Sequence, residues 1–366
     1  MKNRKFISFI FVAVLAFVLG ACVYEDSIPT SLDQVSSDQV AADQPELGSM
    51  FISVEQLHAL MQQNDPNLVV IGVATGGYSI PGSITFNGYS TFTRTGGPYS
   101  VGPGVPNQRW SVEHMSLILS WAGVTSDSHV VVYSNTSPHN GTRLLWDLHV
   151  MGLDNAQFLN GGMNGWIEAG LPAVPNSETV VDDSISLSEF TPRNYRQDEI
   201  VIGLEGAVYA AQNPDTWLIL DVRAPNEFAG EHNPSYNGFY GRIANSVNIQ
   251  WVDVFAPGSN NTLLRPEAEI REIFAPAFDG RNVLLLCRGN PRATFAWAVL
   301  TDLGVNAYIF NGSWHTWAYA LDPDNNHPLH ETVISLSEAV SHTDPAVIAY
   351  LISTGLLSCC AEQLAN

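Results

Sequence analysis

The sequence contains two halves that repeat each other. Phe158–Trp166 and Ile309–Trp317 each consist of an apolar pair, Asn-Gly and a closing Trp, and they lie about 150 residues apart. The apolar segments Val130–Tyr133 and Val283–Leu286 recur at nearly the same spacing. A period of this length has the size of a whole domain and is far longer than a solenoid repeat. The sequence therefore predicts two copies of one domain.

Short segments rich in β-branched residues and Leu alternate in each copy with helical patterns, such as Val112–Ala122 and Glu267–Ala275. Buried parallel strands joined by crossover helices have this pattern. The predicted fold class is α/β, with two doubly wound domains that each have a central parallel sheet. In such sheets ligands bind at the carboxyl ends of the strands.

The two copies are predicted to span residues 50–172 and 201–330. A stretch rich in Pro and Asp separates them, so residues 173–200 are expected to be a linker.

The first residues have the features of an export signal. Three basic residues precede an apolar run over residues 6–19, which is short for a membrane span. Small residues then lead to Cys22, as in the bacterial lipobox, where a peptidase cleaves and the cysteine is acylated. We expect residues 1–21 to be a lipoprotein signal peptide, Cys22 to be the lipidation site and residues 22–49 to be a flexible tether.

The expected location is therefore the cell envelope, with the protein lipid-anchored on the periplasmic or cell-surface face of a bacterial membrane. An ordinary secretory signal and an uncleaved anchor are the alternatives.

The chain is strongly acidic. Of its 366 residues, 36 are acidic and 15 are basic, and the formal net charge is -21. Such a surface repels phosphate backbones, which excludes nucleic acid as a partner. We expect the acidic excess to keep an exported protein soluble, and we expect a monomer.

Cys287 is the candidate nucleophile. It follows the predicted strand Val283–Leu286 and precedes a helical pattern over residues 293–300. At such a junction, turned backbone N–H groups form an anion-binding nest and the helix dipole adds positive potential. The adjacent Arg288 and Arg292 favour the thiolate, which is the reactive form. A buried structural cysteine is the alternative.

Several motifs of the second copy, taken together, resemble the rhodanese family. Asp221–Phe228 resembles the D-x-R-x-x-x-E-[YF] motif, Gly241–Ile249 the G-H-I-x-G-A-x-x-[IL] element, and Asn311–Trp317 the closing G-G-[FW]-x-x-W. With the cysteine loop, they make residues 50–330 similar to a tandem rhodanese of the thiosulfate sulfurtransferase type.

This resemblance implies sulfur transfer without a metal or an organic cofactor. The thiolate takes the outer sulfur of thiosulfate or a similar donor, becomes a persulfide and passes the sulfur to cyanide or a thiol. The implied partners are a small anionic sulfur donor and a nucleophilic acceptor.

The resemblance also implies roles for individual residues. Cys287 would carry the sulfur, the N–H groups of the loop Arg288, Gly289, Asn290 and Arg292 would stabilise the persulfide, and Arg292 would help to hold the donor.

Three further residues lie in the motif that begins at Asp221. Arg223 would be a second anion contact, with an ion pair to Glu227 as the alternative. Asp221 and Glu227 would give structural support.

The loop departs from the family pattern. Loops of the thiosulfate type commonly read C-R-x-G-x-[RT], whereas here Gly289 precedes Asn290, and Pro291 removes one N–H. Because Asn tolerates left-handed backbone geometry, the loop can still close. Arg288 favours thiosulfate over mercaptopyruvate as the donor.

The first copy lacks this equipment. Its equivalent loop, Ser134–Arg143, has no cysteine, and Gly72 stands where the second copy has Asp221. Ser134 and His139 could form a nucleophile and base, but no third partner is visible. We expect a catalytically degenerate domain that packs against the active one and shapes its cleft.

The C-terminal tail, residues 331–366, contains Cys359 and Cys360. Asp344 and Pro345 could begin a helix there. Because adjacent cysteines bridge only with strain, we expect packing residues or free thiols. The histidines show no spacing typical of zinc, so no metal is expected.

Two other functions remain open. A rhodanese-like phosphatase or arsenate reductase needs a Cys-x5-Arg loop, and Arg292 is the fifth residue after Cys287, so the loop is one residue short. A non-enzymatic envelope protein that uses the fold for binding is the second alternative.

Overall fold

The computed structural model describes residues 50–96, 100, 104–135, 137–176, 189–232 and 240–320, and all of these belong to one unit. The predicted signal peptide, the tether with Cys22, the tail helix and Cys359 and Cys360 lie outside the described residues. Within the described ranges, no helix has the length and apolar composition that crossing a membrane requires.

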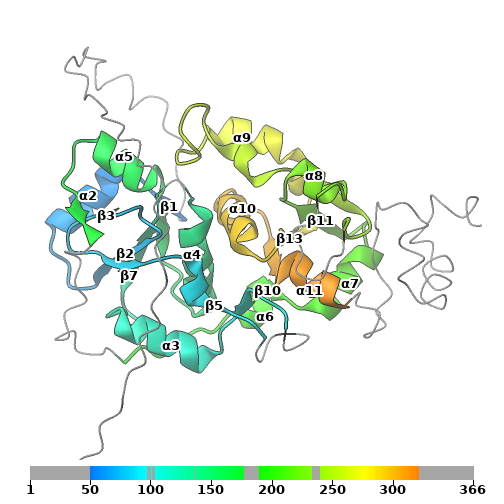
Figure 1. Ribbon diagram of the computed structural model, residues 1–366, viewed down its shortest axis with the longest axis horizontal. Coiled ribbons are helices and arrows are strands. Elements are labelled where there is room, and N and C mark those ends of the chain that lie inside the picture. Colours follow the sequence, from blue (N-terminus) through cyan, green and yellow to red (C-terminus); the bar gives the residue numbers. More distant parts are fainter. Residues whose placement is uncertain are drawn as a thin grey trace, which may run out of the picture. The chain divides into compact units, whose positions relative to one another are not determined.

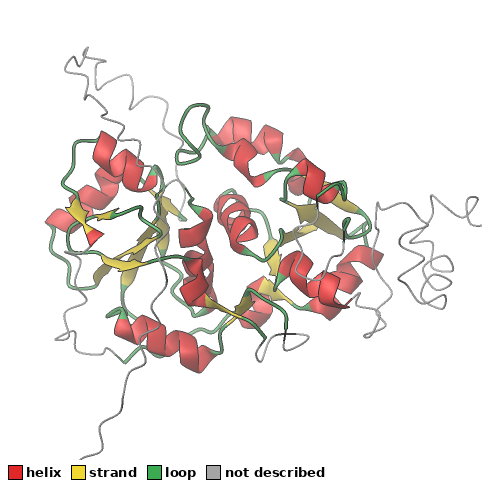
Figure 2. Ribbon diagram, viewed as in Figure 1, coloured by secondary structure: helices red, strands yellow, loops and turns green. Residues whose placement is uncertain are grey.

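Two five-stranded parallel sheets repeat one strand order (Figures 1 and 2). The first has the order β1 (Phe51–Ile52), β8 (Gln157–Leu159), β7 (His129–Tyr133), β2 (Leu68–Val73) and β4 (Ile84–Phe86). The second has the order β10 (Val201–Ile202), β14 (Ala307–Phe310), β13 (Asn282–Leu286), β11 (Trp217–Asp221) and β12 (Ser246–Asn248).

This identity of order confirms the α/β fold class with two copies of one domain. The central strands are apolar because both of their faces are covered, which is typical of parallel sheets. In β13, for example, every residue after Asn282 is buried.

Helices connect the strands in both halves. The first half contains α2 (Val54–Gln62), α3 (Val112–Trp121), α4 (His139–Val150), α5 (Gly162–Glu168) and the 3-10 helix η1 (Tyr89–Phe92). The second half contains α6 (Gln197–Ile200), α7 (Leu204–Gln212), α8 (Pro225–Phe228), α9 (Glu267–Ile273), α10 (Pro291–Asp302), α11 (Ser313–Ala320), and the 3-10 helices η3 (Trp251–Val254) and η4 (Ala275–Phe278).

Two short antiparallel pairs lie in the first half. They are β3 (Tyr78–Ser79) with β9 (Val174–Pro175), and β5 (Thr93–Arg94) with β6 (Gln108–Arg109).

The pairing of β9 moves the boundary of the first domain. Because β9 pairs with β3 and Asn176 hydrogen-bonds Thr75 at 3.1 Å, the first half extends past residue 172 to Asn176. At the other end of the predicted linker, the Arg196 N–H donates to Val150 O at 2.9 Å.

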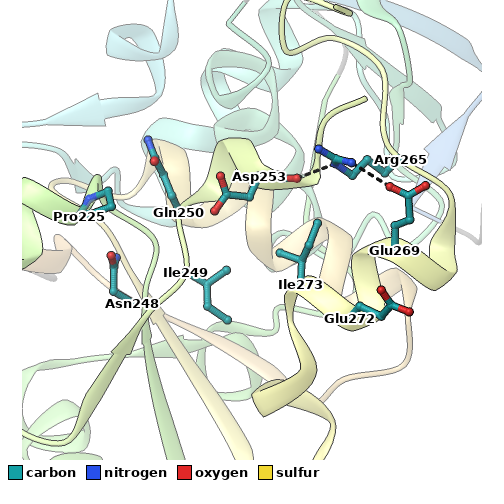
Figure 3. A pocket seen from close by; sticks show the side chains of 9 residues that line it. All are labelled: Pro225, Asn248, Ile249, Gln250, Asp253, Arg265, Glu269, Glu272 and Ile273. Carbon is teal, nitrogen blue, oxygen red and sulfur yellow. Dashed lines mark hydrogen bonds and ion pairs between the residues drawn. The ribbon is translucent and has the colours of Figure 1, made fainter. Parts of the chain in front are cut away.

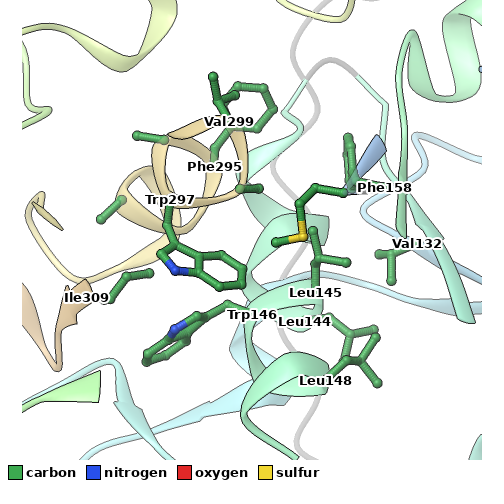
Figure 4. Packing of buried hydrophobic residues seen from close by; sticks show 14 of the residues in the cluster. Val132, Leu144, Leu145, Trp146, Leu148, Phe158, Phe295, Trp297, Val299 and Ile309 are labelled. Carbon is green, nitrogen blue, oxygen red and sulfur yellow. The ribbon is translucent and has the colours of Figure 1, made fainter. Parts of the chain in front are cut away.

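The two halves share one hydrophobic core. Buried residues of α4 and α10 belong to a single cluster, in which Trp146 and Leu145 come from α4 and Trp297 and Phe295 from α10 (Figure 4). Both helices are buried over most of their length. The helix that follows the cysteine loop is therefore held in place by the first half.

Candidate active site

Cys287 lies between a central strand and a buried helix. It directly follows β13, the middle strand of its sheet, and α10 begins at Pro291. The residue is a free cysteine with 1% of its surface exposed. The structure thus has the strand-to-helix junction that the sequence predicts.

The loop after Cys287 presents backbone N–H groups. The N–H of Cys287 itself donates to Ser313 Oγ at 3.2 Å, and Pro291 has no N–H. Within the part of the chain that the structure describes, the N–H groups of residues 288–290 have no hydrogen-bond partner. Three consecutive N–H groups before a helix are therefore available to hold a negative charge.

Asn290 closes the loop in a left-handed conformation, with φ 85°. Its Oδ1 accepts a hydrogen bond from Ser313 Oγ at 2.7 Å, and its Nδ2 donates to Asn311 Oδ1 at 3.5 Å. This backbone conformation is strained for residues other than Gly, although Asn tolerates it better than most. The two hydrogen bonds stabilise the conformation, and they come from the segment that begins α11.

Ser313 is a site residue that the motif analysis missed. It has φ 52°, and the first half has Gly162, with φ 56°, at the corresponding position. The sequence signal for Ser313 is a serine where the other copy has a glycine in the left-handed region. It occurs in the copy that carries the cysteine. Its hydroxyl connects the Cys287 N–H with the Asn290 side chain.

Arg292 forms a two-point ion pair with Glu227. Nη1 donates to Oε2 at 2.5 Å and Nη2 to Oε1 at 2.9 Å. Burial alone would lower the pKa of Arg292, but Glu227 and, next, the Cys287 thiol outweigh it, so the pKa is raised. Burial opposes ionisation of Glu227, yet Arg292 holds the pKa of that carboxyl below its ordinary value. Arg292 therefore stays protonated near the thiol, and the Glu227 carboxylate balances part of its charge.

Arg223 pairs with Asp221 and not with Glu227, which corrects the ion pair considered from the sequence. Its Nε lies 2.9 Å and its Nη2 2.6 Å from the Asp221 carboxylate, and Nη2 also donates to Gly241 O at 2.8 Å. The guanidinium lies 4.6 Å from the centre of the Trp314 ring.

Asp221, at the buried end of β11, needs a cation, and Arg223 two residues on supplies it. Both side chains are fully buried, and Nη1 of Arg223 has no hydrogen-bond partner among the described residues. The anion contact expected of Arg223 stays a prediction, while Asp221 and Glu227 each pair with an arginine.

Arg288 is the exposed member of the loop, whereas Gly289 and Asn290 are buried. Its carbonyl accepts the His315 N–H at 3.0 Å. Burial, together with Arg288 and Arg292, lowers the pKa of His315 to about 4. The histidine beside the loop is therefore neutral near pH 7, and the arginines supply the positive charge.

Ser134 occupies the position of Cys287 in the first half. Its carbonyl accepts the Met163 N–H, as that of Cys287 accepts the Trp314 N–H. The Ser134 hydroxyl is buried without a partner among the described residues, as is Nδ1 of His139. Burial and Arg292 lower the pKa of His139 to about 4. The two side chains do not form a nucleophile–base pair.

The first half also brings a charge towards the site. Arg143 on α4 is fully buried and forms an ion pair with Asp147. Burial lowers its pKa to about 10, against the opposing effect of Asp147 and a smaller one of the Cys287 thiol.

A pocket of about 600 Å³ in the second half contains none of the predicted site residues (Figure 3). It is lined by Pro225, Asn248, Ile249, Gln250, Asp253, Arg265, Glu269, Glu272 and Ile273. Asn248, which lines the pocket, donates to the carbonyls of Asp221 and Arg223, so the pocket lies beside the backbone of these two residues. Within the described ranges, no group of three or more His, Cys, Asp or Glu residues could hold a metal ion.

The chain is similar to known sulfurtransferases. It is 22% identical over 286 residues to the thiosulfate sulfurtransferase of Azotobacter vinelandii, covering 77% of this chain and 97% of that protein. It is 24% identical over 221 residues to the 3-mercaptopyruvate sulfurtransferase of Escherichia coli, covering 57% and 72%.

The fold is similar to that of solved structures at low sequence identity. The crystal structure of Tum1 from Saccharomyces cerevisiae superposes with a TM-score of 0.63 at 18% identity, covering 77% of this chain and 98% of that one. The sequence matches the rhodanese-like domain family twice, over residues 53–169 and 206–320. The chain therefore belongs to the rhodanese-like family, as a tandem-domain rhodanese.

Proposed function

We propose that this protein is a thiosulfate sulfurtransferase that carries sulfane sulfur as a persulfide on Cys287. The observation that carries the proposal is the loop after Cys287, with three available N–H groups at the start of α10 and the Arg292 charge nearby. A thiolate and a persulfide anion are both stabilised by such a site. The sulfurtransferase relatives support sulfur transfer in general.

In the first step the Cys287 thiolate attacks the outer sulfur of thiosulfate. A bond forms between Sγ and that sulfur, the bond to the sulfonate sulfur breaks, and sulfite leaves with the electron pair. In the second step cyanide or a thiolate attacks the outer sulfur of the persulfide, and the Cys287 thiolate leaves. The protein returns to its starting state, and no redox partner is needed.

The preference for thiosulfate rests on Arg288. Its side chain is exposed, and the thiosulfate dianion gains more from a nearby cation than the mercaptopyruvate monoanion does. Mercaptopyruvate is the competing donor, because one of the relatives is named a 3-mercaptopyruvate sulfurtransferase.

An assay of the purified full chain separates the candidate functions. Thiosulfate with cyanide, and mercaptopyruvate with cyanide, are followed by thiocyanate formation, and an aryl phosphate tests the phosphatase alternative. Faster turnover of thiosulfate than of mercaptopyruvate supports the proposal. Hydrolysis of the aryl phosphate, or binding of thiosulfate without any thiocyanate, would overturn it in favour of a phosphatase or of a non-enzymatic binding protein.

We also propose that the enzyme is a monomer, anchored through acylated Cys22 in the cell envelope and facing the periplasm or the cell surface. The lipobox sequence and the polar residues 22–49 support this proposal. A small anionic donor and a nucleophilic acceptor would reach Cys287 there, and the net charge of -21 argues against nucleic acid as a partner.

A further inference from the structure

A chain of hydrogen bonds joins the first half to the cysteine loop. Gln108, in β6 of the first half, accepts through Oε1 a hydrogen bond from Asn311 Nδ2 at 3.2 Å. Its Nε2 donates to Thr316 Oγ1 at 3.2 Å and to Pro106 O at 3.1 Å. The amide of Gln108 is therefore held in one orientation from both of its ends.

The chain continues to the nucleophile. Asn311 Oδ1 accepts from Asn290 Nδ2, Asn290 Oδ1 accepts from Ser313 Oγ, and Ser313 Oγ accepts from the Cys287 N–H. In each of these bonds the donor lies on the Cys287 side and the acceptor on the Gln108 side, so each bond polarises the next. The four residues whose side chains form this chain, Gln108, Asn290, Asn311 and Ser313, are each at most 3% exposed. A buried polar atom without a hydrogen bond lowers stability there.

Two glycines of the second half make room for this contact. A Cβ on Gly289, in the cysteine loop, would lie 2.3 Å from Asn107 Nδ2. A Cβ on Gly312 would lie 2.1 Å from Gln108 Nε2. Asn107 and Gln108 thus lie directly against the backbone of the two segments that form the site.

The strained residues of the site depend on the same hydrogen bonds. Asn290 and Ser313 both have positive φ, and their side chains bond each other. A conformation of this kind persists where its surroundings fix it. Gln108 is the point at which the first half fixes it.

We propose that Gln108 is a positioning residue for the reaction at Cys287. It touches neither donor nor acceptor, but through Asn311 and Asn290 it holds the loop in the geometry in which the N–H groups stabilise the sulfur anion. The half without a thiol therefore contributes to the chemistry of the half that has one. This inference rests on the proposed function for its kinetic part.

The test compares Gln108→Met with the control Thr142→Val in the full-length chain. Met has a similar length and packs well, but it cannot join the hydrogen-bond chain. Thr142 is also fully buried between the halves, where its hydroxyl lies 3.1 Å from that of Thr294. The Thr294 hydroxyl donates to Pro291 O at 2.7 Å, and Thr142→Val leaves this bond in place. Thr142 is not part of the hydrogen-bond chain from Gln108 to the Cys287 N–H. Matching thermal stabilities of the two variants show that any difference in chemistry is not a folding defect.

The first readout needs no turnover. The rate at which iodoacetamide alkylates Cys287 is measured against pH. In Gln108→Met we expect the midpoint of this profile to move to higher pH, because a loosened loop stabilises the thiolate less. In Thr142→Val it stays unchanged.

The second readout is sulfur transfer. Gln108→Met should lower kcat by about tenfold to a hundredfold, as expected for a small misplacement of reacting groups, with little change in KM. In an Asn290→Ala background, Gln108→Met should add little further loss, because both residues belong to one network.

The outcomes separate the two proposals. If wild type transfers sulfur and Gln108→Met behaves like Thr142→Val in both readouts, the positioning role is overturned and the proposed function stands. Additive losses in the double variant would also overturn the positioning role, since Gln108 would then act by another route.

If wild type transfers no sulfur, the proposed function fails, and an unchanged alkylation profile in Gln108→Met would overturn the positioning role as well. Should Gln108→Met not fold, Gln108→Asn withdraws the amide while keeping its polarity, and the same outcomes apply.

Discussion

The hydroxyl oxygens of Thr142 and Thr294 lie 3.1 Å apart, although the residues are 152 positions apart in the sequence. They hold the same place on α4 and α10, because each is the fourth residue of its helix. Equivalent residues of two copies meet in this way across an approximate twofold axis. The duplicated domains therefore pack through the same face, and this face includes the helix that follows the cysteine loop.

The halves are nevertheless unequal in chemistry. Ser134 occupies the place of Cys287 in the first half, and its hydroxyl has no hydrogen-bond partner among the described residues. We expect Ser134→Ala and His139→Ala to leave turnover nearly unchanged, because neither residue is placed for catalysis. A steady-state assay checks this, and a loss of a hundredfold or more, equal to about 2.7 kcal/mol on the transition state, would contradict it.

We expect the ion pair between Arg292 and Glu227 to stabilise the protein and to assist donor use. Arg292→Ala leaves a carboxylate with 8% of its side chain exposed and no cation, which should cost roughly 3 kcal/mol of unfolding free energy. The same variant removes a positive charge beside the thiolate and should slow reaction with thiosulfate.

Urea denaturation measures the loss of unfolding free energy in Arg292→Ala. The double variant that also carries Glu227→Gln is the comparison. In the Arg292→Ala background, Glu227→Gln should restore part of the stability, because a neutral amide is cheaper to bury than a carboxylate. An Arg292→Ala variant as stable and as active as wild type would show that the ion pair neither stabilises the protein nor assists donor use.

Two buried histidines predict how stability depends on pH. The pKa values of His139 and His315 are both about 4, below the ordinary 6.5. Between these values the unfolded chain binds protons that the folded protein does not, so stability is complete above pH 6.5 and falls as the pH drops towards 4. Each histidine contributes roughly 3 kcal/mol to this loss.

Denaturation at a series of pH values tests the prediction. Because His315→Gln removes one titrating group, its stability should fall less steeply than that of wild type over this range. Identical slopes for the two proteins would mean that His315 is protonated equally in both states.

Local patterns predicted the elements that carry the site, because burial leaves a periodic signal. The strand and helix expected around Cys287 are β13 and α10, with boundaries extended by one or two residues. The family resemblance implied the roles of the loop after Cys287, of Arg292 and of Arg223, and these roles stay predictions.

The pairings inside the site could not be predicted in this way. Whether Arg223 pairs with Asp221 or Glu227 depends on the direction of each side chain at the end of β11. Gln108 and Asn311 lie 203 residues apart, and a polar residue in a two-residue strand leaves no periodic signal. Such contacts depend on the tertiary structure.

Membrane attachment should depend on Cys22. Cys22→Ser removes the acylated residue, and we expect the protein to appear in the soluble extracytoplasmic fraction, because acylation at the lipobox is the anchor that the sequence predicts. Fractionation with and without detergent measures this. Persistence of the variant in the detergent-dependent fraction would reject a lipid anchor at Cys22.

The most direct test of the central claim is the mass of the peptide that contains Cys287 after incubation with thiosulfate. One added sulfur atom, about 32 Da, is expected on Cys287 and on neither Cys359 nor Cys360, and cyanide should remove it. Cys287→Ser should fold but gain no sulfur and not turn over, because a hydroxyl is not appreciably ionised near neutral pH and cannot carry transferable sulfur. Persulfide on Cys359 or Cys360 instead, or unimpaired sulfur transfer by Cys287→Ser, would contradict the account.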